Sequence, residues 1–264
     1  MFNTERTYGI EIEVVKLNSA TIRDLIAELA AADVKAYDST SSYDHNIRQG
    51  QWKIMKDASI TGNSGFEIVS PPLKGDEGID EVIAVLSVLR KLGARVDDSC
   101  GMHIHHDVSD LSRNQIAQAT KLYNKHENVM DEQVPADRRM NNAYYCRSVR
   151  SQESNIEMFV NNRRVYESDA RYCKVNVRAY LRHQTLEFRQ ADANLSTANA
   201  IAWIVFTQAF CEKAKASRIS GNMQAPDSSW NKMLRELNML PFQNQECEIT
   251  LASIDFFKRN RKNA

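Results

Sequence analysis

The feature that most constrains the fold is the alternation at residues 8–15, Tyr-Gly-Ile-Glu-Ile-Glu-Val-Val. Its period of two predicts a β-strand. The aliphatic side chains of Ile10 and Ile12 share one face of this strand. Glu11 and Glu13 share the other face, about 7 Å apart, and repel each other unless a cation or an arginine lies between them. For a single Glu-x-Glu pair, a solvated sheet face is the simpler interpretation.

Later strands repeat this arrangement. Residues 65–72, Gly-Phe-Glu-Ile-Val-Ser-Pro-Pro, predict a strand that ends at the double proline, and Glu67 lies among core-like neighbours. Residues 100–107, Cys-Gly-Met-His-Ile-His-His-Asp, place His103 and His105 on one face of a strand, where two imidazoles can hold one metal ion or anion. His-x-His alone is a weak signal, because histidines of the core or surface are more common than ligands.

Residues 172–180 and 185–190 predict an antiparallel hairpin. Its polar face is expected to carry Lys174, Asn176, Arg178, Glu187 and Arg189. Together the strands then turn many acids and imidazoles to one face, which is electrostatically untenable without divalent cations. Oxygen-rich ligand sets favour Mg²⁺ or Mn²⁺, and one imidazole among them is compatible with Mn²⁺ and tolerable for Mg²⁺.

The predicted fold class is α+β, with a curved and mainly antiparallel sheet and helices packed on its apolar face. Residues 1–264 are expected to form a single catalytic domain whose part from about 217 to 264 is helical. Helices are expected near residues 21–32, 78–92, 112–130, 152–160, 196–216, 229–237 and 251–258. Two polar segments, 38–50 and 135–147, are expected to be loops. The arginines and tyrosines of the second segment suit either a phosphate or base contact or a solvated surface.

Composition indicates which classes of protein the sequence favours. The 34 basic and 34 acidic residues give no net charge, so no global basic field favours nucleic-acid binding. The sequence has no run of 18 apolar residues and no charged-then-apolar leader, and a cytoplasmic location without a membrane span is therefore expected. The five cysteines are scattered and never spaced as Cys-x-x-Cys, which favours reduced thiols over disulfides or a zinc site.

Five short motifs occur in a fixed order: Gly-x-Glu-x-Glu (9–13), Trp-Lys-x-x-x-Asp-x-Ser (52–59), Gly-x-Glu-Ile-Val-Ser-Pro-Pro-Leu (65–73), Cys-Gly-Met-His-x-His-x-Asp (100–107) and Leu-Glu-Phe-Arg (186–189). In this order the sequence resembles the amidoligase family, whose members share the glutamine synthetase type of carboxylate-amine ligase fold. The resemblance covers roughly Tyr8 to Phe210. Glutamine synthetases usually bring further acids between the first strand and the histidine motif, and whether Asp57 substitutes for them is left open.

The resemblance implies roles for individual residues. By this likeness Glu11, His103 and Glu187 hold one metal ion, and Glu13 and Glu67 hold another. His105 and Arg189 face phosphate. The residues expected to act in catalysis are Arg189, Glu187 and Arg178, and those expected to bind the nucleotide are His105, Arg189, Arg139 and Asn176.

The implied reaction is ATP-dependent amide formation through an acyl phosphate with Mg²⁺ or Mn²⁺. Its substrates are a glutamate-like carboxylate and an amine acceptor, and nucleic acid enters only as a modified-base substrate. No Gly-x-x-x-x-Gly-Lys-Ser/Thr loop is present, so metal ions and arginines must hold the phosphates. Two alternatives stay open, a metal-dependent hydrolase or nuclease and a non-catalytic binding protein. The Glu-x-Arg strand beside Asn176-Val177-Arg178 favours the ligase.

Overall fold

The computed structural model describes residues 2–17, 19–41, 48–60, 65–163, 171–240 and 248–260. Residues 42–47 of the predicted 38–50 loop, and Cys247, lie outside these ranges. The chain divides into two compact units. The N-terminal unit comprises Thr4–Ile104 and Ala191–Ile201, and the C-terminal unit comprises Met1–Asn3, His105–Gln190 and Ala202–Ala264. The single domain expected over residues 1–264 stays a prediction.

Strands of the N-terminal unit follow the order β2-β3-β4-β1-β5. Their bounds are β1 Tyr8–Val14, β2 Ala36–Asp38, β3 Trp52–Lys56, β4 Phe66–Val69 and β5 Met102–Asp107. Strand β4 pairs antiparallel with both β1 and β3, whereas β2 pairs parallel with β3. The predicted loop from residue 38 is therefore preceded by a short strand. Strand β5 passes into the C-terminal unit after Ile104.

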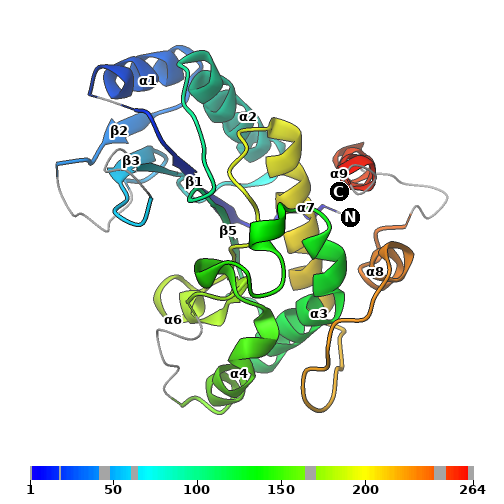
Figure 1. Cartoon of the computed structure of the whole chain (residues 1–264). Helices are drawn as coiled ribbons and strands as arrows, with labels where there is room; N and C mark the ends of the chain where they lie inside the picture. Colours follow the sequence, from blue (N-terminus) through cyan, green and yellow to red (C-terminus); the bar gives the residue numbers. More distant parts are fainter. Residues whose placement is uncertain are drawn as a thin grey trace. The chain divides into compact units, whose positions relative to one another are not determined.

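Two helices complete the N-terminal unit, α1 Ser19–Ala31 and α2 Gly75–Lys91. They lie side by side in Figure 1, and α1 also contacts β2. Leu25 of α1 and Val82 of α2 are buried with Ile10 and Ile12 of β1, so the helices supply the other half of an aliphatic core. The alternation of β1 thus has the consequence predicted for it, because the aliphatic positions enter the core.

Strands of the C-terminal unit follow the order β5-β7-β6, with bounds β6 Val175–Asn176 and β7 Thr185–Phe188. The predicted antiparallel pairing is confirmed. The predicted first strand over residues 172–180 is wrong beyond Asn176. The Asn176 side chain accepts a hydrogen bond from the Arg178 backbone N–H at 2.9 Å, which starts a 3-10 helix, η4 (Val177–Ala179). The short helix α6 (Tyr180–His183) follows and ends at Gln184, whose φ of 57° is left-handed.

The remaining helices are α3 Arg113–Asp131, α4 Glu153–Val160, α7 Thr197–Ala214, α8 Trp230–Glu236 and α9 Glu248–Asn260. Ser112 is the N-cap of α3 and forms a capping box with Gln115, in which each side chain accepts a hydrogen bond from the other residue's backbone N–H. The segment 135–147, predicted to be irregular, contains the 3-10 turns η1 Ala136–Arg138 and η2 Tyr144–Cys146, and η3 Val149–Gln152 follows. The C-terminal unit has an aromatic core in which Tyr123 contacts Phe188 and Phe210.

These elements confirm an α+β fold with a mixed, mainly antiparallel sheet. No helix among the described residues has the length and apolar character needed to cross a membrane. The four cysteines among the described residues are buried thiols rather than disulfides, as the scattered spacing predicts.

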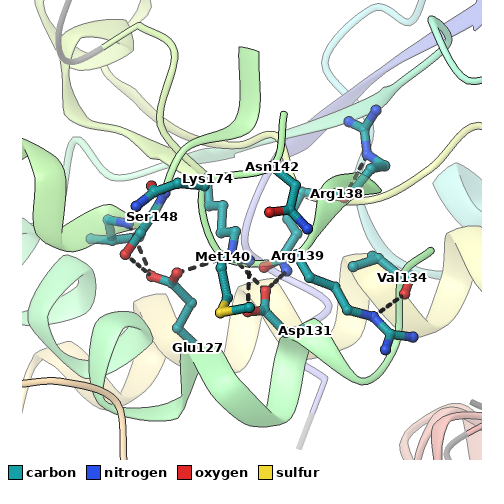
Figure 2. Close-up of polar contacts among 12 residues, drawn as sticks. Glu127, Asp131, Val134, Arg138, Arg139, Met140, Asn142, Ser148 and Lys174 are labelled. Carbon is teal, nitrogen blue, oxygen red and sulfur yellow. Dashed lines mark hydrogen bonds and ion pairs between the residues drawn. The ribbon is translucent and has the colours of Figure 1, made fainter. Parts of the chain in front are cut away.

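A buried ion network holds the C-terminal unit together. Lys174 has no solvent-exposed surface, and its Nζ lies 2.9 Å from Glu127 Oε1 and 2.5 Å from Asp131 Oδ1, both on α3. Figure 2 shows the lysine pointing between the two carboxylates. Gln190, just beyond β7, also donates to Asp131 at 2.6 Å. The buried Arg138 in turn donates to the backbone carbonyl of Gln190 at 3.0 Å. The network therefore joins α3 to the ends of β6 and β7.

Replacing Lys174 by methionine keeps most of the length of the side chain but leaves two buried carboxylates without their cation. We expect Lys174→Met to lower the free energy of unfolding by about 3–5 kcal/mol in urea titrations. The control is Lys232→Met, which removes an exposed lysine from α8 in the same unit. Equal unfolding midpoints for the two variants would show that the network does not stabilise the fold.

Candidate functional site

Side chains of β3, β4 and β1 form rows across the sheet of the N-terminal unit. One row is apolar and buried, and consists of Ile54, Ile68 and Ile12. The next row consists of Met55, Glu67 and Glu13, which are partners along the same ladder and lie on the opposite face. The register therefore sets Glu67 directly opposite Glu13, where like charges destabilise a strand pair.

Electrostatic repulsion concentrates on Glu67. Burial raises the pKa of this carboxyl well above its ordinary value, and the charges of Glu11, Glu13 and Asp57 raise it further. Glu67 also shares a hydrogen bond with Glu11, which favours the protonated form. Asp57 therefore adds its charge to those of Glu11 and Glu13 around Glu67.

His103 of β5 lies among these carboxylates. Its Nδ1 is 3.1 Å from Glu11 Oε2, and its Nε2 is 3.7 Å from Glu13 Oε1. The other oxygen of Glu13 accepts a hydrogen bond of 2.5 Å from the Gly101 backbone N–H. One oxygen of Glu13 is thus fixed by the backbone, and the other faces the imidazole.

The donor set suits a divalent cation. Glu13, Glu67 and His103 each offer one ligand atom, and these atoms lie within 4.8 Å of one another. Carboxylate oxygens with a single imidazole nitrogen match Mg²⁺ or Mn²⁺ better than zinc, which prefers sulfur and several imidazoles. A cation here would also remove the repulsion that raises the Glu67 pKa. We call Glu11, Glu13, Glu67 and His103 the carboxylate cluster.

Lys53 is a member of this face that the sequence reasoning missed. It pairs with Val69 on β4, and Val69 pairs with Glu11 on β1, so Lys53 and Glu11 share a row on the acidic face. Only 3% of the lysine is exposed. The alternation of Trp52 and Ile54 into the core was the available signal, because it directs Lys53 to the opposite face.

A second polar group, the Glu187 cluster, lies in the C-terminal unit. It consists of Asn176, Glu187, Arg189, His105 and Thr185. The Asn176 amide donates to Glu187 Oε2 at 2.6 Å, and Arg189 forms an ion pair with the other oxygen, Oε1. His105 Nε2 is 3.9 Å from that oxygen, and its Nδ1 is 2.9 Å from the Thr185 hydroxyl. Both oxygens of Glu187 therefore have fixed partners.

Two predicted site residues take other positions. Arg178 lies in η4 rather than on a strand, and it is half-buried. Arg139 donates from Nε to the Val134 carbonyl at 2.9 Å, and Figure 2 shows its side chain beside this carbonyl. Their roles in catalysis and nucleotide binding stay predictions. The same holds for a metal ion shared by Glu11, His103 and Glu187, because Glu187 belongs to the other unit.

The comparison with protein families agrees with these motifs. The family model described as "Putative amidoligase enzyme" matches residues 4–211. A search of curated proteins finds no match. Similar solved structures include a novel glutamine synthase homolog (TM-score 0.45, 13% identity), the Pup ligase PafA in complex with the ubiquitin-like protein Pup (0.45, 13%) and a GmaS/ADP complex (0.48, 12%). These matches cover 98% of this chain and 67%, 64% and 70% of the others, so the chain spans about two thirds of their length.

The raised pKa of Glu67 predicts how metal-free protein responds to pH. Below the ordinary glutamate pKa of about 4.3, Glu67 is protonated in both folded and unfolded chains, and Glu67→Gln has little effect. Above it, only the unfolded chain loses the proton readily, so the native glutamate increasingly destabilises the fold. We expect Glu67→Gln to be more stable than the parent at pH 7–8, with a difference that grows with pH.

The same variant should lose the response to metal. Mn²⁺ at a hundredfold above its Kd is expected to stabilise the parent by about 2.7 kcal/mol, and Glu67→Gln by much less. Urea unfolding with and without Mn²⁺ at pH 5 and 8 measures both effects. The matched control is Glu5→Gln, an exposed glutamate paired with Lys74, which should leave both responses unchanged. A full Mn²⁺ response in Glu67→Gln would remove Glu67 from the ligand set.

Proposed function

The chain belongs to the amidoligase family, and on this premise we propose that it is an ATP-dependent carboxylate-amine ligase that requires a divalent metal ion. One observation carries the proposal: the gathering of Glu13, Glu67 and His103 ligand atoms within 4.8 Å in a chain of this family. Enzymes that transfer a phosphoryl group need positioned charge more than a protein nucleophile. The polar faces of this chain provide charge of both signs.

The proposed reaction has two steps. A carboxylate oxygen of the donor substrate attacks the γ-phosphorus of ATP, the bond from that phosphorus to the β-γ bridging oxygen breaks, and ADP leaves. The resulting acyl phosphate is attacked at its carbonyl carbon by the amine nitrogen. The carbon–oxygen bond to phosphate then breaks, the nitrogen loses a proton, and the products are an amide and inorganic phosphate.

The carboxylate cluster is proposed to hold the metal ion. Glu13, Glu67 and His103 would bind it, and Glu11 would orient the imidazole through the 3.1 Å contact to Nδ1. A bound Mg²⁺ or Mn²⁺ neutralises charge on the phosphate oxygens of ATP. The backbone N–H of Gly101 keeps one oxygen of Glu13 in place, so that carboxylate needs little rearrangement when the ion binds.

The Glu187 cluster is proposed to act on the phosphoryl group. Glu187 fixes the guanidinium of Arg189, and Asn176 fixes Glu187, so the arginine is presented in one orientation. His105 is held by Thr185 and would face phosphate. Under the proposal Arg178 assists catalysis, and Arg139 and Asn176 bind the nucleotide.

The substrates are proposed by class. The donor is a glutamate-like carboxylate, and the acceptor is an amine on a peptide, a polyamine, a cell-wall component or a modified nucleobase. The segments 38–50 and 135–147 are proposed to select between them, because long polar loops commonly determine specificity. The proposed location is the cytoplasm.

ADP release in the presence of Mg²⁺ or Mn²⁺ identifies the substrates. Amino acids and amines are screened in pairs, and the ligase predicts a pair that releases ADP and phosphate in equal amounts with an amide product. Bond cleavage without ATP would instead identify a metal-dependent hydrolase or nuclease. Absence of nucleotide binding with Mg²⁺ in calorimetry would identify a binding protein.

Glu187→Gln tests the proposed chemistry at one residue. The variant keeps the size of the side chain but removes the charge that holds Arg189, so we expect ATP turnover to fall by about 10²–10³-fold. Circular dichroism should show an intact fold. The control is Glu157→Gln, which removes an exposed glutamate from α4 in the same unit and should turn over ATP normally. Ordinary turnover by Glu187→Gln would contradict the proposed role.

A further inference from the structure

One short segment of the C-terminal unit carries most of the exposed large apolar surface. Five large hydrophobic side chains are exposed in the described part of the chain, and the three most exposed belong to residues 140–145. Met140 is 64% exposed, Tyr144 61% and Tyr145 50%. Exposed apolar side chains that gather in one place, rather than being scattered singly, indicate an interaction site.

The backbone of this segment is held in place, so its exposure is not that of a loose loop. At one end Asp131 accepts from the Met140 N–H at 2.9 Å, and at the other Glu127 accepts from the Val149 N–H at 2.9 Å and from the Ser148 hydroxyl at 3.1 Å (Figure 2). Both acids belong to the Lys174 network. The segment is therefore supported by a buried framework while its large side chains face outward.

A second chain segment supports the middle of the first. The Arg147 N–H donates to the Tyr172 carbonyl at 2.8 Å, and the Lys174 N–H donates to the Arg147 carbonyl at 2.9 Å. This bridge brings Tyr172 to the exposed tyrosines. The ring centroids of Tyr144, Tyr145 and Tyr172 lie 5.1–5.2 Å from one another.

Arginines flank the three rings. The Arg147 guanidinium lies 5.8 Å from the Tyr144 ring centroid, and the exposed Arg171 lies 5.9 Å from that of Tyr172. An apolar aromatic centre with charged residues beside it has the anatomy of a protein interface. We call Tyr144, Tyr145, Tyr172, Arg147 and Arg171 the tyrosine–arginine surface.

The composition of this segment indicates what kind of molecule would bind the tyrosine–arginine surface. Residues 138–152, Arg-Arg-Met-Asn-Asn-Ala-Tyr-Tyr-Cys-Arg-Ser-Val-Arg-Ser-Gln, contain four arginines and no lysine, aspartate or glutamate. Tyrosine, arginine and methionine are enriched in protein interfaces, whereas lysine and the acids are depleted. Arg138 is buried against backbone carbonyls, but Arg147 and the exposed Arg171 place positive charge beside the rings, so the complementary partner is acidic.

From these observations we infer that the tyrosine–arginine surface docks an acidic segment of another polypeptide. The inference goes beyond the proposed ligation and does not depend on it. The surface is nevertheless close to the Glu187 cluster along the chain. Asn176 is four residues after Tyr172, at most about 14 Å in an extended backbone, and it contacts Glu187.

Selection from a displayed library of random 12-residue peptides tests the inference without an assumed ligand. The full-length protein is the bait, and the double variant Tyr144→Ala/Tyr145→Ala is used for counterselection. We expect the enriched peptides to carry a net negative charge. A fluorescein-labelled copy of the most enriched peptide is then titrated with each variant and followed by fluorescence polarisation.

Affinity for this peptide should fall at least tenfold in the double variant. It should also fall in Arg171→Gln, and the affinity of this variant should depend less on salt concentration than that of the parent. Leu181→Ala, which removes a 47% exposed side chain on α6 in the same unit, should bind as the parent does. Urea unfolding of each variant shows that the fold is retained, as expected for exposed positions.

Three outcomes would overturn the inference. The first is selection of no peptides, or of peptides without negative charge. The second is equal binding of the selected peptide by the parent and the double variant. The third is that a labelled oligothymidylate binds the parent more tightly than the peptide does, and that this binding is lost in the double variant. That result would reassign the surface to nucleic acid.

Discussion

Repulsion between carboxylates on one face of the sheet is the physical basis of the proposed metal site. The ladder of β1 and β4 sets Glu13 opposite Glu67, and burial keeps water from screening them. The opposite face is committed to an aliphatic core, so the acids cannot turn away without exposing it. The fold therefore creates an unfavourable arrangement that only protons or cations relieve, and His103 places one nitrogen ligand within that arrangement.

In the C-terminal unit the buried acids of two groups form ion pairs with basic side chains. There Lys174 is the cation for two carboxylates, and Arg189 pairs with Glu187, so the described acids of these two groups already have positive partners. In the carboxylate cluster the register sets Glu13 opposite Glu67, an imidazole lies beside Glu11 and Glu13, and Lys53 shares a row with Glu11. The opposition of two carboxylates is why we propose the metal ion at the carboxylate cluster, and we assign the Lys174 network to holding the frame.

Much of the fold could be predicted because the patterns are local. The alternation at Ile10 to Glu13 gives the face of each side chain, and the apolar stripes give the helices. The predicted strand over residues 172–180 was wrong beyond Asn176 because its alternation continues past that residue, while a side-chain cap turns the backbone there. Such a cap competes with strand pairing and leaves no period in the sequence.

The site was predictable in part for the same reason. Strand alternation correctly put Glu67, His103 and Glu187 on polar faces, but it gives no register between strands. The pairing of Glu67 with Glu13, and the row that contains Lys53, follow from the ladder. The Lys174 network joins residues 43 and more positions apart, and no short pattern marks such a contact in the sequence.

Electron spin echo spectroscopy of bound Mn²⁺ is the sharpest test of a metal ion at the carboxylate cluster, because it detects nitrogen ligands of the ion itself. We predict that the parent protein binds Mn²⁺ with a ¹⁴N coupling from an imidazole, and that His103→Gln loses this coupling. Bound Mn²⁺ whose ¹⁴N coupling persists in His103→Gln, or no Mn²⁺ binding by the parent, would contradict a metal ion at the carboxylate cluster.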